Sequence, residues 1–189
     1  MKKLKNTSKP REVSTKAPQI DLERYVPAFF SWISNKLSRG ASQHYLNTFN
    51  VGIETWRCLV LLAISDSITA QQISRVLGMD KGSVSRCLKT MQERSLIRLE
   101  LDQADGRIRI AVLTQEGRDL HNQMIGMALD RERAFLSVLD KSEVEVLIGL
   151  LRRLHENLPV VEAASQEYAK KKFPNQLGIK KVTARETED

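Results

Sequence analysis

Residues 69–91 read TAQQISRVLGMDKGSVSRCLKTM, and this stretch decides the fold. Thr69 and Gln72 have the spacing of a capping box, so a helix of about two turns begins here. Gly78 stands just past that helix, and Asp80 is a good N-cap for a second helix almost immediately afterwards. Two helices joined by so tight a turn predict a helix-turn-helix. The predicted buried stripes are Ile73, Val76 and Leu77 in the first helix and Val84, Leu88 and Met91, with Cys87 alongside, in the second.

The opposite face of the second helix is small, polar and mostly basic. It carries Gly82, Arg86, Lys89 and Glu93, with Ser85 and Thr90 beside them. A slim helix face can approach base edges in the major groove, and arginine is the side chain best suited to paired hydrogen bonds with guanine. We therefore predict that Arg86 contacts a base. The other predicted DNA contacts of this helix are Lys81, Ser83, Ser85 and Lys89. In isolation, such basic residues would more often be a solvated face.

A two-stranded hairpin follows, because the apolar period changes to alternation. The alternating residues are Ile97, Leu99 and Leu101, and then Ile108, Ile110 and Val112. The loop at 102–106 ends in Asp105-Gly106, which supplies turn chemistry, and Arg107 stands at the tip. We predict that Arg107 contacts DNA, with Arg109 in the same strand, and that Asp102 or Asp105 holds the Arg107 guanidinium by a bidentate pair. The alternative is that the aspartates only form the turn.

Four further segments have the apolar spacing of helices. The first is apolar around much of its circumference, so we expect it to be buried on several sides, and its Pro27 is best tolerated in a first turn. Its wide apolar surface indicates either subunit contact or a central core helix, and the sequence leaves both open. The segments are Tyr25 to about Leu46, a helix after the turn at 50–52, a long helix that Thr114 caps, and a helix that Asp140 and Glu143 start and that runs to Leu158.

Composition limits the class of protein. The chain has 189 residues, with 30 Lys and Arg against 23 Asp and Glu, a net charge of +7 and 41% hydrophobic residues. This length buries enough surface for one core domain without disulfides. There is no apolar run of about 18 residues and no short apolar segment behind the basic start, so we expect neither a membrane span nor a secretory signal. With only two cysteines and no disulfide framework, we expect a cytoplasmic location. The basic balance indicates an anionic partner.

We predict three parts along the chain. Residues 1–19 are basic and poor in apolar side chains, which indicates a disordered tail. Residues 20–158 form the folded body. Residues 159–189 form a charged C-terminal tail that is mostly irregular around one helix across 161–172.

The order of the predicted elements is typical of a winged helix-turn-helix framed by a helical interface. Over residues 26–158, about two thirds of the chain, the sequence resembles the MarR family of dimeric winged-helix transcription regulators. Residues 78–86 match that family's turn and recognition-helix start. Residues 102–107 and 113–118 match its acidic-then-arginine wing and its L-T-x-x-G helix start.

The resemblance implies a mainly α-helical protein with a small β-hairpin wing. Its winged domain spans about 53–113, and helices at about 20–47 and 114–158 form the dimerisation region. It also implies a homodimer that binds a pseudo-palindromic operator in double-stranded DNA, most often as a repressor, with Arg107 in the minor groove. Many relatives carry further basic residues where Ala104 and Gly106 stand, so we expect this wing to hold phosphate less firmly.

The resemblance further implies a pocket for a small aromatic or phenolic effector. The candidate lining residues are Trp32, Arg39, His44 and Trp56, for which ordinary core and interface packing is the alternative. Cys58 and Cys87 fall beside apolar helix positions, which favours buried thiols over redox sensors. Some relatives sense peroxide through a cysteine in the first helix, where this chain has none.

Other chemistry is disfavoured. The chain has no Gly-rich phosphate loop, no nucleophile elbow and no HExxH motif, so we expect neither an enzyme nor a cofactor. His44, His121 and His155 lie on three separate helical segments, which disfavours a metal site.

We therefore predict a sequence-specific transcription regulator that responds to a ligand. One alternative is a constitutive DNA-binding protein without an effector. The other is a helical interaction module whose basic tails dock it on acidic partners. A salt-sensitive but sequence-independent affinity would favour the module.

Overall fold

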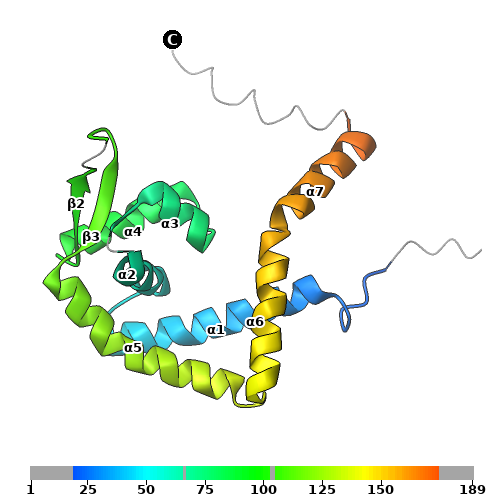
Figure 1. Ribbon diagram of the computed structural model, residues 1–189, viewed down its shortest axis with the longest axis horizontal. Coiled ribbons are helices and arrows are strands. Elements are labelled where there is room, and N and C mark those ends of the chain that lie inside the picture. Colours follow the sequence, from blue (N-terminus) through cyan, green and yellow to red (C-terminus); the bar gives the residue numbers. More distant parts are fainter. Residues whose placement is uncertain (1–18, 66, 103–104, 175–189) are drawn as a thin grey trace, which may run out of the picture. The chain divides into compact units, whose positions relative to one another are not determined.

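A computed structural model describes residues 19–65, 67–102 and 105–174 (Figure 1). The residues outside these ranges are 1–18, Asp66, the wing residues Gln103 and Ala104, and 175–189. Of the predicted N-terminal tail, only Gln19 is therefore described. The chain divides into two compact units, Met1–Ile125 and Gly126–Asp189, and each is described by itself. Within the described ranges, no helix combines the length and the apolar character that crossing a bilayer requires.

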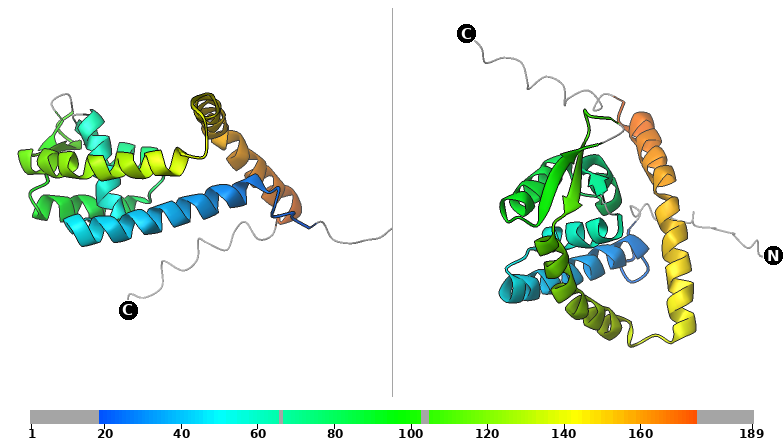
Figure 2. Two further views of the ribbon diagram at one scale, coloured as in Figure 1. Left: turned by 90° about the horizontal axis from the view of Figure 1, so that it is seen from below. Right: turned by 60° about the vertical axis from the view of Figure 1, so that its left-hand side comes forward.

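The first unit holds the predicted helix-turn-helix and hairpin. The mainly helical fold with a small β-hairpin wing is thus confirmed, and Figure 2 shows the same elements from two further sides. In chain order the elements are α1 (Val26–Phe49), α2 (Ile53–Ser65), β1 (Ser67–Thr69), α3 (Ala70–Leu77), α4 (Lys81–Glu93), β2 (Ile97–Leu101), β3 (Arg109–Leu113) and the first half of α5 (Gln115–Leu136).

The sheet has a third strand that the sequence did not predict. The strand order is β1-β3-β2, with both pairs antiparallel, and Ala111 of β3 lies between Ile68 of β1 and Leu99 of β2. β1 is only three residues long, which is too short for alternation to be recognised. Its last residue, Thr69, also caps α3, so strand and helix follow each other without a loop.

The core of the first unit lies among α2, α3, α4, the sheet and the start of α5. Its fully buried side chains are Val51, Cys58, Leu59, Leu62, Ile73, Val84, Met91, Leu113 and Met124. The predicted burial of Ile73, Val84, Leu88 and Met91 is confirmed, but the prediction for Val76 is wrong, because that side chain is 58% exposed. α3 has only eight residues, so only a narrow stripe of its side chains packs into the core, and Ile73 is its buried residue.

Close packing at the start of α5 explains the L-T-x-x-G pattern. The Thr114 hydroxyl donates to the Ser95 carbonyl at 2.6 Å and accepts the Gly117 N–H at 3.1 Å, which confirms that Thr114 caps this helix. A Cβ on Gly117 would lie 2.1 Å from the Leu96 carbonyl oxygen. Glycine is therefore required where α5 passes the turn before β2.

α1 is less buried than its apolar sequence predicts. Only Ala41 and Tyr45 are buried, so the expectation of burial on several sides is wrong for the single chain. The N-terminal half leaves a row of apolar side chains in solvent, and the central-core reading is thereby disfavoured. The exposed residues of α1 and its approach are Tyr25, Val26, Phe29, Phe30, Trp32, Ile33 and Leu37.

The second unit consists of the rest of α5, α6 (Lys141–Glu156) and α7 (Leu158–Lys172). The capping box of Asp140 and Glu143 is present as predicted. The helix predicted from Asp140 to Leu158 ends at Glu156, with Asn157 as its cap. The helix predicted across 161–172 corresponds to α7, which begins earlier, at Leu158, with Pro159 in its first turn. Neither α6 nor α7 contains a buried residue in the single chain.

Candidate nucleic-acid interface

The turn between α3 and α4 is fixed by local contacts. Gly78 closes α3 with a φ of +63°, a conformation that glycine adopts without strain. The Ser74 hydroxyl donates to the Met79 carbonyl at 2.7 Å, and Asp80 Oδ1 accepts the Ser83 N–H at 2.9 Å. These contacts set the angle at which α4 leaves the turn.

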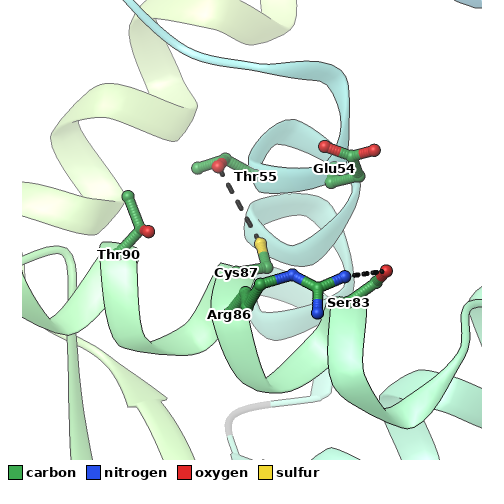
Figure 3. A pocket seen from close by; sticks show the side chains of 6 residues that line it. All are labelled: Glu54, Thr55, Ser83, Arg86, Cys87 and Thr90. Atoms are coloured by element: carbon green, nitrogen blue, oxygen red, sulfur yellow. Dashed lines mark hydrogen bonds between the residues drawn. The ribbon is translucent and has the colours of Figure 1, made fainter.

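Arg86 is held in place by residues at the start of its own helix. Its Nη2 atom donates to the Ser83 hydroxyl at 2.9 Å (Figure 3). Hydrogen bonds from the Ser83 side chain and backbone, and to a lesser degree the charge of Arg86, lower the pKa of the Asp80 carboxyl. A Cβ on Gly82 would lie 3.2 Å from Asp80 Oδ1 and 3.3 Å from Arg86 Nη1, so Gly82 leaves room for this arrangement.

Most of the predicted contact residues of α4 lie on its solvent-exposed side. Lys81, Ser85, Arg86 and Lys89 are exposed, and Ser83 is half-buried. Lys89 lies 3.8 Å from the Glu93 carboxylate, one turn further along, so part of its charge is balanced within the helix. The small side chains keep the backbone of this face open to close approach.

The wing differs from the predicted arrangement. Asp105 Oδ1 accepts the backbone N–H of Arg107 at 3.0 Å, and Asp102 Oδ1 accepts the backbone N–H of Asp105 at 3.0 Å. Among the described residues, no ion pair joins Asp105 to the Arg107 guanidinium, and the contacts of Asp105 are those of the alternative in which it forms the turn. The role of Asp102 or Asp105 in holding Arg107 against DNA stays a prediction. Carboxylates at a turn satisfy nearby N–H groups first, because those donors lie within the same few residues.

The wing and α4 belong to the same unit, and β2 packs against α4. Arg107 and Arg109 are both exposed on the hairpin, which stands beside α4 in Figure 1. The two predicted DNA-contacting elements are thus present in one compact body. Sequence reasoning identified Asp80 as an N-cap and Gly82 as part of the slim face, but missed their part in positioning Arg86. The spacing of Asp80, Ser83 and Arg86, which places them on one helix face, could have indicated it.

Several other arginines have internal partners. Arg57 Nη2 donates to the Ser38 hydroxyl at 2.8 Å, Arg94 Nη1 to the Asn50 carbonyl at 2.7 Å, and Arg118 Nη2 to the Leu113 carbonyl at 3.3 Å. Their charge is used to join elements of the first unit. The 30 lysines and arginines of the chain therefore overstate the number of cations that are available to a partner.

The four candidate effector residues are spread out. Trp56 is buried, stacks on His121 with ring centres 5.7 Å apart, and lies 5.6 Å from the Tyr45 ring. Trp32 is 44% exposed and contacts Phe29, and Arg39 and His44 are exposed. Trp32 lies about 20 Å along α1 from Tyr45, from the rise per residue of an α-helix. The single chain thus places Trp56 apart from Trp32.

A pocket opens between the recognition helix and α2. Its lining residues are Glu54, Thr55, Ser83, Arg86, Cys87 and Thr90 (Figure 3). The polar lining comes from both helices, with Glu54 and Thr55 on α2 and Ser83, Arg86 and Thr90 on α4. No group of three or more His, Cys, Asp or Glu side chains in the described part of the chain is arranged to hold a metal ion.

A helix-turn-helix with an exposed basic face, followed by an arginine-tipped hairpin, defines a winged helix-turn-helix DNA-binding domain. A family model described as the MarR family matches residues 49–108. The transcriptional regulator HosA of Escherichia coli O157:H7 is 30% identical over 97 residues, which cover 50% of this chain and 72% of HosA. The chain belongs to the MarR family.

Solved structures of the same fold agree with this assignment. A MarR/EmrR family transcriptional regulator from Acinetobacter is 29% identical, with a TM-score of 0.70 over 74% of this chain and 99% of that one. The MepR chain in the Staphylococcus aureus MepR–DNA complex is 24% identical, with a TM-score of 0.62 over 70% of this chain and 97% of MepR. At this identity, the likeness shows that the two chains share a fold. The chain spans 64% to 66% of the length of two further curated relatives from Bacillus subtilis.

Proposed function

We propose that this chain is a DNA-binding transcriptional regulator that acts as a homodimer on a pseudo-palindromic operator. The observation that carries the proposal is the exposed face of α4, which has small side chains and basic residues. On this face the Arg86 guanidinium is oriented by its hydrogen bond to the Ser83 hydroxyl. The wing supplies a second arginine, Arg107, in the same unit. Regulators of this family, and the DNA-bound state of MepR, support the same function.

Arg86 has the role of base contact and Lys89 that of phosphate contact. A guanidinium can make two parallel hydrogen bonds to guanine, whereas an ammonium on a flexible stem holds phosphate as a point charge. The Lys81, Ser83 and Ser85 side chains flank Arg86 along the helix and complete the contact surface. Arg107 and Arg109 on the hairpin reach the adjacent minor groove and its backbone.

Dimer formation is supported by the apolar surfaces that each unit leaves open. The N-terminal half of α1 exposes its aromatic residues, and α6 exposes Val146, Leu150 and Leu154 at 62%, 47% and 48%. Exposing so many apolar side chains to water is unfavourable, and contiguous exposed apolar patches mark interaction sites. Two-fold symmetry would place one winged domain on each half-site.

Repression relieved by a small aromatic or phenolic effector is the form of regulation that family membership supports best. Trp56 is buried against the Tyr45 and His121 rings, so the candidate effector residues that a ligand can reach in the single chain are Trp32, Arg39 and His44 on α1. A location in the compartment that holds the chromosome follows from DNA binding, and no catalytic role is proposed.

The decisive experiment is selection of genomic fragments bound by the purified full-length protein, followed by footprinting. We expect a pseudo-palindrome, with Arg86→Ala costing about 1–3 kcal/mol and relaxing preference at one base position in each half-site. Arg57→Ala is the matched control, because Arg57 pairs with Ser38 inside the unit. Uniform, salt-sensitive binding to all fragments would instead favour the interaction module with basic tails.

A further inference from the structure

The two cysteines of the chain lie side by side in the core of the first unit. Cys58 of α2 and Cys87 of α4 are free thiols, and their Sγ atoms are 3.7 Å apart. A disulfide has an S–S length of about 2.05 Å, so the two sulfurs need to approach by less than about 2 Å. The pair joins the recognition helix to the helix that it packs on.

The two thiols differ in access. Cys58 is fully buried, whereas Cys87 is 9% exposed and lines the pocket between α2 and α4 (Figure 3). The Thr55 hydroxyl lies 3.9 Å from Cys87 Sγ on the α2 side of that pocket. A molecule of the size of hydrogen peroxide can therefore reach Cys87 from the pocket, whereas Cys58 is buried and not directly accessible to it.

The same contact makes the two thiols chemically unequal. The hydrogen bond with Cys58 lowers the pKa of Cys87 to about 7, against the opposing effect of burial, and Thr55 adds to the lowering. The interaction raises the pKa of Cys58 in turn. Because the thiolate is the nucleophile, Cys87 is the reactive member of the pair near neutral pH.

We propose that Cys58 and Cys87 are a thiol pair that a hydroperoxide oxidises to an intrachain disulfide, which displaces the recognition helix. In the first step the Cys87 thiolate attacks the peroxide O–O bond, forming a sulfenic acid and releasing hydroxide or alkoxide. In the second step the Cys58 sulfur attacks the sulfenic sulfur, the S–O bond breaks, and water leaves with the Cys58 proton. The hydroperoxide accepts two electrons, and the two thiols supply them.

The bond acts on DNA recognition through the position of α4. Cys87 follows Arg86 directly and lies on the buried side of the helix with Val84, Leu88 and Met91. Drawing Cys87 toward α2 shifts or rotates the helix that carries every predicted contact of the recognition face. This consequence rests on the proposed function, whereas disulfide formation itself does not.

The test uses the reduced full-length protein, treated with hydrogen peroxide and digested with trypsin under non-reducing conditions. We expect a linked product of the peptide that runs from Cys58 to Arg75 and the short peptide that runs from Cys87 to Lys89. The protein should stay a monomer band on a non-reducing denaturing gel. Operator affinity should fall at least tenfold and return on reduction with dithiothreitol.

Two variants assign the order of events. Cys58→Ala should form no link and should leave a Cys87 sulfenic acid that dimedone traps. Cys87→Ala should form neither the link nor the dimedone adduct. If either variant fails to fold, the peptide map of the wild-type protein, compared before and after peroxide treatment, still tests whether the disulfide forms, because it requires no substitution.

Three results would overturn the proposal. They are two free thiols after peroxide treatment, a link between chains in place of a link within one chain, and a complete Cys58–Cys87 link with unchanged operator affinity. If the untreated protein bound no DNA at all, the proposed function would fail, but the peptide map would still decide whether the thiol pair exists.

Discussion

Arg86 shows how one side chain can be made ready by its neighbours. The hydrogen bond to Ser83 and the charge of Asp80 hold the guanidinium near the start of α4. Ordering a free long side chain costs up to about 2 kcal/mol, and part of that cost is met before DNA arrives. Asp80 therefore serves the helix as a cap and the binding surface as a positioning residue.

The cap function of Asp80 has a pH dependence with a definite sign. Its folded pKa is lowered from the ordinary value of 3.8, so the charged carboxylate favours the folded state. The stabilisation is present above the unfolded pKa and is lost as the pH falls through the folded pKa. We expect urea midpoints of the wild type to exceed those of Asp80→Asn at neutral pH, with the gap closing on acidification. A gap independent of pH would contradict the role of the charge, since asparagine also caps helices.

Gly117 is a second position where one residue decides local geometry. A Cβ there would meet the Leu96 carbonyl oxygen at 2.1 Å, so Gly117→Ala should destabilise the fold by about 1–3 kcal/mol, as overpacking does. Gly126→Ala in the same helix is the control, because nothing lies within 4 Å of its Cβ position, and it should be neutral or stabilising by up to about 1 kcal/mol. Thermal unfolding of both variants checks this, and equal effects would contradict it.

At the scale of elements, the wing is a turn whose shape is set by aspartate side chains. Asp105 binds the backbone N–H of Arg107, and the Ile108 N–H donates to the Asp105 carbonyl at 2.9 Å. The position of Arg107 thus depends on the backbone of the turn. Its guanidinium is free of Asp105 and can meet DNA directly.

Three variants separate backbone support from charge at the wing. We expect Arg107→Ala to weaken operator binding and to reduce the difference between A·T-rich and G·C-rich flanks, because a minor-groove arginine senses groove width. Asp105→Ala should lose part of the affinity, whereas Asp105→Asn should keep it, since asparagine also accepts the backbone N–H. Affinities at two salt concentrations are the measurement. Equal losses for Asp105→Asn and Asp105→Ala would show that the carboxylate charge is needed.

Much of the arrangement of elements could be predicted from the sequence, because caps and apolar spacing are local signals. The capping boxes at Thr69 and Asp140 and the hairpin at 97–113 are examples. β1 could not be predicted, because its pairing with β3 is a contact between distant residues. The internal partners of Arg57 and Arg94 also depend on tertiary packing, so sequence gave no means of separating these cations from those on α4.

At the scale of the whole molecule, each of the two units, taken by itself, leaves apolar helix faces exposed. α6 and α7 have no buried residue, and α1 has two. Helices of this kind gain most of their stability from packing of an apolar face. The proposed homodimer would supply that packing.

A charge introduced on these surfaces tests the dimer. We expect the wild type to be a dimer by light scattering at micromolar concentration, and Leu150→Glu to be largely monomeric with weakened operator binding, because a buried unpaired carboxylate opposes association. Ile64→Glu is the control, since Ile64 is 77% exposed at the end of α2 in the first unit. A wild-type monomer that still binds the operator tightly would contradict this prediction.

Thr69 has a mechanical consequence. The residue pairs with Ile110 of β3 and, through its hydroxyl, accepts the Gln72 N–H that starts α3. β1 runs into α3 without a loop and pairs with β3 of the wing, so the first helix of the helix-turn-helix and the hairpin are directly connected through the sheet. In the proposed complex, a displacement of α3 would therefore be transmitted to the hairpin, and the DNA contacts of α4 and of the wing would weaken together.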